Sequence, residues 1–375
     1  MRGVVQEVAR IVVLRANAVG DYLLSLPALH GLREAYPQAR IVLAGAPWHA
    51  RTLSCRPGPV DEVVVLPTVP RLAGLAPDAP PGEQLPAFLA EMRRRRFDLA
   101  VQLHGGGAAA NPLVREFGAR LTAGLRARDA APLDRWVPYR FYQPEVARAL
   151  EVVALVGARH PVDPVRFAVT AADRAKTGPY LPTSNGTPLV ALHPGASDER
   201  RRWPAERFAA LGDALAACGA AVLVTGTAAE TDLVTTVTGR MRAAALPLAG
   251  AFDLGGLAAC YERCALVVSN DTGPRHLAEA VGTPTVGLFW CGNAINAAPA
   301  TRSAHRVLLS WTLQCPQCGA DCTRDLYPHR HGDGCTHRCS FVTDIPVAEA
   351  IAESVDLLEW AVPERALPER TQPQD

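Results

Sequence analysis

The 375-residue sequence lacks the long apolar runs that would place it in a membrane. No segment approaches the roughly 20 uninterrupted apolar residues that a membrane-spanning helix needs. The N-terminal stretch MRGVVQEVARIVVLRANAVG has too short and too interrupted an apolar part for a signal peptide. We therefore expect a cytoplasmic protein, and peripheral contact with the inner membrane face stays open.

A strong net charge is also missing, since 38 Lys and Arg residues and 37 Asp and Glu residues leave a formal charge of +1. This balance gives no reason to expect nucleic acid as a partner. The longest basic run, EMRRRRFDL with arginines at 93–96, has two interpretations. It is either a solvated helix end before a strand, or a basic patch for anionic lipid or a phosphorylated acceptor.

The distribution of cysteines gives no sign of a disulfide framework either. Half of the ten cysteines lie in one segment, CPQCGADCTRDLYPHRHGDGCTHRC at 315–339, which also contains three histidines: Cys315, Cys318, Cys322, His329, His331, Cys335, His337 and Cys339. The Cys-x-x-Cys start and the compact supply of soft ligands suit zinc, and a cytoplasmic location disfavours disulfides. We predict a structural zinc ion, with free thiols or a disulfide or redox role as the alternatives. The expected ligands are Cys315, Cys318, Cys335 and Cys339.

The chain length indicates two domains, and the order of the patterns agrees. In the first half, RIVVLR, ARIVLAG, DEVVVLP and FDLAVQLHGG are continuous apolar runs, typical of strands buried on both faces of a parallel sheet. After the Pro- and Gly-containing stretch KTGPYLPTSNGTP (176–188), strands and helices alternate again. The fold class is therefore α/β, with two Rossmann-like domains facing each other across a cleft.

We place an N-terminal domain at 1–178 and a C-terminal domain at 187–345, followed by a helix and tail at 346–375. In the C-terminal domain, WPAERFAALGDALAACG predicts a helix with Phe208, Leu211 and Leu215 on one face and Gly219 just past its end. In doubly wound sheets, ligands collect at the carboxyl ends of the strands, so the loops there are the candidate sites.

The first such loop is VGDYLLSLP, where an acid, Asp21, stands where a phosphate-binding loop would favour glycine. Asp21 is either the N-cap of the following helix or a carboxylate that acts on a substrate. A side chain used up by backbone N–H groups could not also act on a substrate, so the two interpretations compete.

Two further loops carry charge. HPGASDERRRWP (193–204) places three arginines at 200–202 before a helix start. They are either a solvated cluster, or one of them grips a diphosphate in bidentate fashion. In GTAAE (226–230), Glu230 either bonds ribose hydroxyls or complements the helix dipole.

SNDTGPRHLAEAVGTP (269–284) is the most specific stretch. A strand runs into Asp271, Thr272 and Gly273, and Pro274 opens a helix. Its N-terminus is a natural anion site, to which the Thr272 hydroxyl and His276, one turn into the helix, could contribute. For His276 alone, a structural role is the alternative. The array suits a nucleoside diphosphate without a metal.

Together, AVGDYLLSLPAL, FDLAVQLHG, HPGASDERRRWPAERF, VTGTAAE and VSNDTGPRHLAEAVGTPTVGLF resemble glycosyltransferase family 9, the ADP-heptose:lipopolysaccharide heptosyltransferases, from about residue 10 to 345. The resemblance implies a GT-B fold with the acceptor in the N-terminal domain and the donor in the C-terminal one. It also implies transfer with inversion and without a metal, and a last helix that returns to the first domain.

By the same resemblance, Asp21 matches the general base. Thr272, Gly273 and His276 match residues around the donor diphosphate, and Asp271 and Glu230 match positions on the sugar or ribose side. Arg201 takes the place of a lysine near the phosphates, which keeps the charge but changes its reach.

The expected function is transfer of a heptose-like sugar from a nucleotide donor, with ADP-heptose as the first candidate, to a lipopolysaccharide core or other surface glycan. A GT-B-type sugar-nucleotide epimerase and a non-catalytic nucleotide- or glycan-binding protein are the alternatives. Asp21, in the domain opposite the nucleotide loops, argues against the epimerase.

Overall fold

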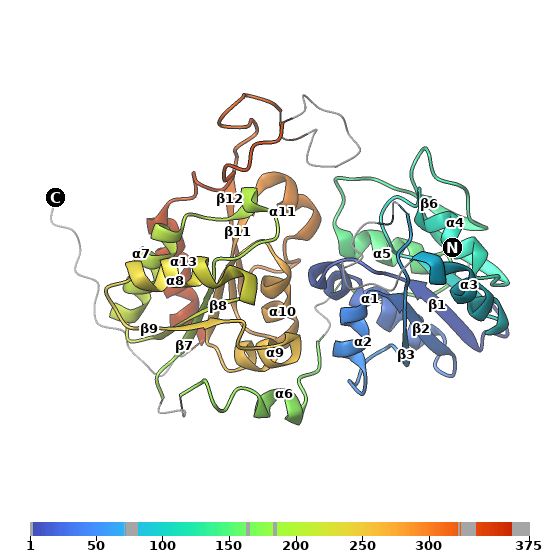
Figure 1. Cartoon of the computed structure of the whole chain (residues 1–375), viewed down its shortest axis with the longest axis horizontal. Coiled ribbons are helices and arrows are strands. Elements are labelled where there is room, and N and C mark those ends of the chain that lie inside the picture. The colour runs from blue at the N-terminus through green and yellow to red at the C-terminus, as the bar shows by residue number, and fades with distance from the viewer. Residues whose placement is uncertain are drawn as a thin grey trace. The chain divides into compact units, whose positions relative to one another are not determined.

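The computed structural model of the chain describes residues 3–70, 72, 82–162, 166–182, 186–321, 323 and 335–361. The chain divides into two compact units, Met1–Ala168 and Val169–Asp375, each built around its own parallel sheet (Figure 1). The predicted α/β class with two Rossmann-like sheets is therefore confirmed. Within these described ranges, no helix has the length and apolar character needed to cross a membrane.

In the described part of the first unit, six parallel strands form a sheet in the order β3-β2-β1-β4-β5-β6. They are β1 (Arg10–Leu14), β2 (Arg40–Gly45), β3 (Glu62–Val65), β4 (Leu99–Gln102), β5 (Leu121–Arg126) and β6 (Arg135–Pro138). The helices are α1 (Val19–Ala35), α2 (Pro47–Leu53), α3 (Leu85–Arg94), α4 (Ala110–Glu116) and α5 (Glu145–Ala154), with a 3₁₀ turn η1 (Gly82–Gln84). Because β1 and β4 are paired neighbours, the residues that follow them meet at one edge of the sheet.

The four predicted strands of this unit are confirmed. The apolar runs of β1, β2 and β4 are buried as expected for a sheet covered on both faces, whereas β3, at the sheet edge, is half-buried. Val12 and Leu14 of β1, for example, belong to the same buried cluster as Met92 of α3 and Val114 of α4. Strands β5 and β6 were not predicted. Strand β6 lies at the sheet edge and alternates half-buried and exposed residues, so it lacks the continuous apolar signal.

The described part of the second unit repeats this design, with strand order β12-β11-β10-β7-β8-β9. The strands are β7 (Leu189–His193), β8 (Ala221–Gly226), β9 (Ala245–Ala249), β10 (Leu266–Asn270), β11 (Thr285–Trp290) and β12 (His305–Ser310). The helices are α6 (Ala171–Ala175), α7 (Ala205–Ala217), α8 (Thr231–Arg240), α9 (Leu254–Glu262), α10 (Gly273–Val281), α11 (Cys291–Ala297) and α13 (Val347–Ala361), with 3₁₀ turns η2 (Glu199–Arg201) and η3 (Ala228–Glu230). The outer strands β9 and β12 were not predicted.

Helix α7 follows its prediction closely. Phe208, Leu211 and Leu215 are fully buried in the core of the second unit. The helix ends at Cys218, and Gly219 follows with a φ of +85°, a left-handed conformation that glycine adopts without strain.

Contacts within the second unit extend to α6 at its start and to α13 at its end. The division between the units falls between Ala168 and Val169, because α6 packs against α9 and Arg174 pairs with Glu262 at 2.7 Å. Helix α13, expected to return to the first domain, packs against α7 and strands β10 to β12 of the second unit. Its Ala350, Leu357 and Leu358 are buried in the core there. The tail beyond 361 lies outside the described residues.

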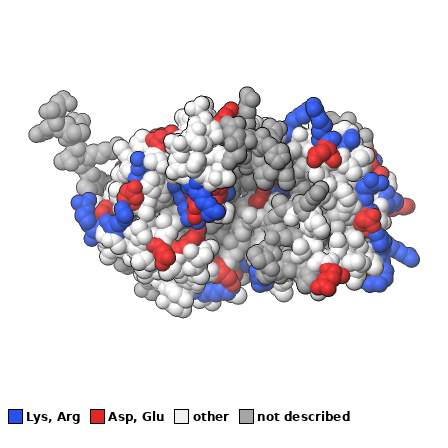
Figure 2. All heavy atoms as spheres, turned by 45° about the horizontal axis from the view of Figure 1, so that its top comes forward, with Lys and Arg blue, Asp and Glu red and all other residues white. Residues whose placement is uncertain are grey.

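The arginine run at 93–96 is partly neutralised by acidic side chains of its own unit. Arg94 pairs with Glu91 at 2.6 Å, Arg95 pairs with Glu62 at 2.7 Å, and Arg93 pairs with Glu116. Figure 2 shows basic and acidic side chains interspersed over the face that it presents. These pairs favour the interpretation of the run as a solvated helix end rather than as a patch for anionic lipid.

Candidate active site

Asp21 lies in the first turn of α1, at the edge of the sheet where the neighbouring strands β1 and β4 both end. It is the third residue of the helix, and Ala18 is the N-cap. Its Oδ2 accepts a hydrogen bond from the Ala18 backbone N–H at 3.2 Å. The side chain nevertheless remains 38% exposed. Asp21 therefore supports the helix start from within the first turn, and its carboxylate still reaches solvent.

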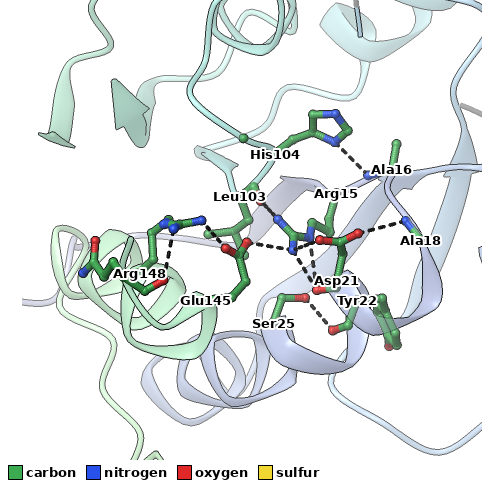
Figure 3. A network of polar contacts seen from close by, with 12 residues as sticks. Arg15, Ala16, Ala18, Asp21, Tyr22, Ser25, Leu103, His104, Glu145 and Arg148 are labelled. Carbon is green, nitrogen blue, oxygen red and sulfur yellow. Dashed lines mark hydrogen bonds and ion pairs between the residues drawn. The ribbon is translucent and has the colours of Figure 1, made fainter. Parts of the chain in front are cut away.

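The buried partner of Asp21 is Arg15, which directly follows β1 (Figure 3). Nη2 of Arg15 lies 3.1 Å from Oδ1 of Asp21 and 2.9 Å from Oε1 of Glu145. The same guanidinium donates from Nη2 to the Asp21 carbonyl at 2.9 Å and from Nη1 to the Leu103 carbonyl. Burial opposes the charged form of Arg15, but the carboxylates of Glu145 and Asp21 outweigh it and raise its pKa.

Two further residues, Arg148 and His104, make hydrogen bonds beside Arg15. Glu145 also pairs with Arg148, whose Nη2 donates to the carbonyls of Arg140 and Phe141 at 2.8 Å each. On the other side of Arg15, Nδ1 of His104 accepts the Ala16 backbone N–H at 3.2 Å (Figure 3). Neither Arg15 nor Glu145 was predicted as a site residue. A single arginine at the end of an otherwise apolar strand was the available signal for Arg15.

In the second unit, four of the predicted donor residues meet at the start of α10. Asp271 follows β10, Thr272 is the N-cap, and Gly273 is the first helical residue. Thr272 and Gly273 are half-buried, and His276 is buried. The first backbone N–H groups of a helix and the positive end of its dipole make such an end suitable for an anion.

Arg201 from η2 comes to the same place. Its Nη1 donates to the Asp271 carbonyl at 3.2 Å and lies 3.6 Å from Oδ2 of Asp271. Its Nε is buried and has no hydrogen-bond partner among the described residues. Arg200, by contrast, pairs with Asp198 at 2.7 Å, and Arg202 donates to the Ala196 carbonyl. Of the three arginines, Arg201 is therefore the one beside the start of α10, with a donor available to a bound anion.

The Asp271 carboxylate is enclosed by donors. Its Oδ2 accepts from Nδ2 of Asn293 at 3.0 Å, and its Oδ1 lies 3.6 Å from Nε2 of His276. Burial alone would raise the pKa of Asp271, but His276 and Arg201 outweigh burial and lower it. Asp271 is thus held as a carboxylate. Asn293 comes from α11, and no motif in the sequence pointed to it.

Arg275, also missed, lies fully buried under His276. Its Nη2 is 2.5 Å from Nδ1 of His276, and its Nη1 pairs with Glu279 at 3.0 Å. Burial and, secondly, the charge of Arg275 lower the pKa of His276, so the ring is neutral near pH 7.

Glu230 ends η3, directly after β8. Its Oε2 accepts from the backbone N–H of Thr227 at 2.8 Å and from the Thr227 hydroxyl at 2.9 Å. Its Oε1 lies so close to Gly195, in the loop after β7, that any side chain at 195 would collide with it. Both loops therefore end at one edge of the second sheet, where the absence of a Cβ at 195 makes room for the carboxylate.

The chain is similar to known proteins over most of its length. The family model of glycosyltransferase family 9 (heptosyltransferase) matches residues 86–327, which is more than half of the chain. The chain belongs to glycosyltransferase family 9. The protein is therefore a glycosyltransferase.

Named relatives of this family 9 protein are distant. It is 24% identical over 316 residues to lipopolysaccharide heptosyltransferase 2 of Escherichia coli K12, covering 80% of this chain and 88% of that one. The solved family 9 glycosyltransferase of Veillonella parvula aligns with a TM-score of 0.76 at 21% identity, covering 95% and 99% of the two chains. The E. coli ADP-heptose heptosyltransferase II aligns with a TM-score of 0.69 at 20% identity, covering 94% and 99%. The predicted GT-B fold is thus confirmed.

The cysteine-rich segment of this glycosyltransferase forms a compact ligand group. One ligand atom each from Cys315, Cys318, Cys335 and His337 lies within 4.8 Å of every other. Nδ1 of His337 is 3.7 Å from Sγ of Cys315 and 3.6 Å from Sγ of Cys335.

Cys339, the fourth ligand expected from the sequence, has its Sγ 3.9 Å from that of Cys315 but is not part of this group of four. Cys322, His329 and His331 lie outside the described residues.

Proposed function

We propose that the protein transfers a heptose-like sugar from a nucleotide donor to a lipopolysaccharide core or another surface glycan. ADP-heptose is the first candidate for the donor. The observation that carries this proposal is the convergence of Arg201 and His276 on Asp271 at the start of α10, in a chain of the heptosyltransferase family. Relatives named as lipopolysaccharide heptosyltransferases support the acceptor class. Family membership favours a glycosyltransferase over the epimerase and the non-catalytic binding protein.

In the proposed reaction, Asp21 is the general base. The acceptor hydroxyl oxygen attacks the anomeric carbon, its proton passes to the Asp21 carboxylate, and the bond from that carbon to the diphosphate oxygen breaks. Attack opposite the leaving group inverts the configuration. A positioned carboxylate contributes about 10²–10⁴-fold to such a proton transfer. The exposed carboxylate and its support from Arg15 fit this role.

The leaving diphosphate gains negative charge as that bond breaks. The N–H groups that begin α10, the Thr272 hydroxyl and the Arg201 guanidinium would stabilise it, so no metal is required at the reacting centre. Neutral His276 can donate one further hydrogen bond. Glu230, fixed by Thr227, would accept hydrogen bonds from the ribose hydroxyls.

The direct test is a donor screen with purified protein, followed by mass spectrometry of the acceptor. ADP-heptose is expected to be bound and its sugar transferred, and Asp21→Ala should bind the donor but lose about 10²–10⁴-fold in rate. Asp129→Asn, an exposed acid of the same unit, is the control. If no nucleotide sugar is bound or transferred, the proposal is wrong. If Asp21→Ala transfers at the wild-type rate, Asp21 is not the base.

We also propose that the cysteine-rich segment binds a structural zinc ion. A tetrahedron with metal–sulfur bonds of about 2.3 Å has ligand-to-ligand edges of about 3.8 Å. The distances of 3.6 and 3.7 Å from His337 to two cysteine sulfurs match such edges. Elemental analysis of the purified protein should find one zinc per chain. Iron in its place, or no metal, would contradict the zinc assignment.

A further inference from the structure

The ligand group is continuous with a segment that touches the arginine turn η2. Phe341 lies four residues after His337 and is buried in the core of the second unit. Its backbone N–H donates to the carbonyl of Arg200 at 2.7 Å. The Arg200 guanidinium lies 5.8 Å from the centre of the Phe341 ring, and Arg338 lies 3.7 Å from the Glu199 carboxylate. Residues 335–341 therefore pack along the outer side of η2.

The inner side of the same turn faces the anion site. Arg201 contacts Asp271 there, and the next buried residue, Trp203, donates its backbone N–H to Oδ1 of Asn270 at 3.0 Å. Nδ2 of Asn270 in turn donates to the Pro194 carbonyl at 2.7 Å. The turn is thus held between the end of β10 on one side and residues 335–341 on the other.

The two halves of the ligand group come from separate parts of the chain. Cys315 and Cys318 lie in a tight turn after β12, in which the Gly319 N–H donates to the Cys315 carbonyl at 2.8 Å. Cys335 and His337 belong to the segment that leads to Phe341. Cys335 and Cys339 pack against the core of the second unit, and Phe341 and Val342 are buried in it. An ion shared by the two halves would therefore fix the start of a segment whose end touches η2.

We propose that a zinc ion held by Cys315, Cys318, Cys335 and His337 fixes residues 335–341 and, through them, keeps η2 in the position that places Arg201 at the donor diphosphate. The ion then acts on donor binding without touching the donor. This inference rests on the proposed function for the identity of the donor. The effect of the zinc ion on η2 can nevertheless be measured without any donor bound.

The test compares zinc-loaded full-length protein with the same protein after chelation and after zinc is added back. Hydrogen exchange of peptides covering 198–204 should speed up on chelation and return with zinc, while peptides of the first sheet stay unchanged. Calorimetric affinities for ADP and for pyrophosphate should weaken about tenfold without zinc, a coupling of ordinary size. The affinity for adenosine, which lacks the diphosphate, should weaken much less when zinc is removed.

Cys318→Ser removes a ligand whose side chain is exposed, so it should reproduce the chelated state without disturbing the core. Cys218→Ser, at the end of α7, is the matched control and should keep both metal and affinity. Unchanged exchange in 198–204, or equal pyrophosphate affinity with and without zinc, would overturn the inference. A protein that shows the zinc effects but transfers no sugar would disprove the proposed function alone.

Discussion

Nη2 of Arg275 lies 2.5 Å from Nδ1 of His276, its neighbour in α10. Arginine can only donate hydrogen bonds, so Nδ1 must accept, and the ring proton belongs on Nε2. That nitrogen lies 3.6 Å from Oδ1 of Asp271. A buried cation that the sequence motif did not reveal thus sets the tautomer of a histidine in the donor site.

The first prediction concerns this pair. Arg275→Met removes a charge that, after burial, lowers the pKa of His276, so the pKa should rise. Protonation would then add positive charge to the donor site, and ADP affinity should increase more steeply below pH 7 than in the wild type. Ring-proton NMR titration measures the pKa directly.

Arg275→Lys keeps a cation there and should keep the pKa of His276 low, while Arg240→Met, at the exposed end of α8, should change nothing. An unchanged His276 pKa in Arg275→Met would show that burial alone lowers it.

The second prediction concerns Arg15. Arg15→Gln removes the buried cation that contacts both Asp21 and Glu145, while Arg148 still pairs with Glu145, so the unfolding free energy should fall by about 1–3 kcal/mol. The rate of transfer should fall about a hundredfold, as expected when a reacting group loses its position. The acid limb of the pH–rate profile should move to higher pH, because loss of the Arg15 charge makes the Asp21 carboxylate easier to protonate.

Arg115→Gln, on the exposed side of α4, is the control for Arg15→Gln. A variant that loses stability while keeping its pH–rate profile would assign Arg15 a purely structural role.

The third prediction uses the contact between Gly195 and Glu230. Gly195→Ala should displace the Glu230 carboxylate and weaken ADP binding as much as Glu230→Ala does. Because both changes remove the same contact to the donor, the double variant should be no weaker than either single one. Gly239→Ala, in α8 with open space around it, should leave affinity unchanged. Additive losses in the double variant would contradict the shared role.

The fourth prediction concerns stability in acid. Burial lowers the pKa of His193 to about 4 and that of His49 to about 3. In the unfolded chain these groups take up protons near pH 6.5, so the unfolded state binds more protons and the free energy of unfolding falls as the pH falls below 6.5. Each of the two histidines should lower the free energy of unfolding by about 2 kcal/mol between pH 7.5 and pH 5.

Urea unfolding across this range measures the loss. His193→Gln should make the free energy of unfolding of the second unit less dependent on pH, and His49→Gln should do the same for the first unit. A slope that survives both substitutions would rule out these two histidines as its cause.

The sequence predicted the sheets well where their strands are fully buried. Residues 11–14 of β1 and 266–268 of β10 are consecutive buried apolar residues because helices cover both faces of the sheet, and such runs stand out in a sequence. Strands β6 and β9 sit at sheet edges with half-exposed residues, and their sequences RWVP and ALPLA carry no comparable signal.

Of the candidate site, the sequence predicted residues that follow a strand and precede a helix, such as Asp21 and Asp271. It could not predict partners that arrive from elsewhere in the chain. Glu145 is 130 residues from Arg15, and Asn293 is 22 residues from Asp271. Arg275 stood within the motif, yet only its burial distinguishes it from a surface arginine.

The buried Arg275 side chain has room because position 287 in β11 is glycine. A Cβ at 287 would lie 2.9 Å from Cδ of Arg275 and 2.5 Å from the ring of Phe289. In evolutionary terms, the order of the two changes is constrained: glycine at 287 must be present before arginine at 275 can be accommodated. Relatives with a larger residue at 287 should therefore carry a shorter side chain at 275, and they must fix the tautomer of the following histidine in another way.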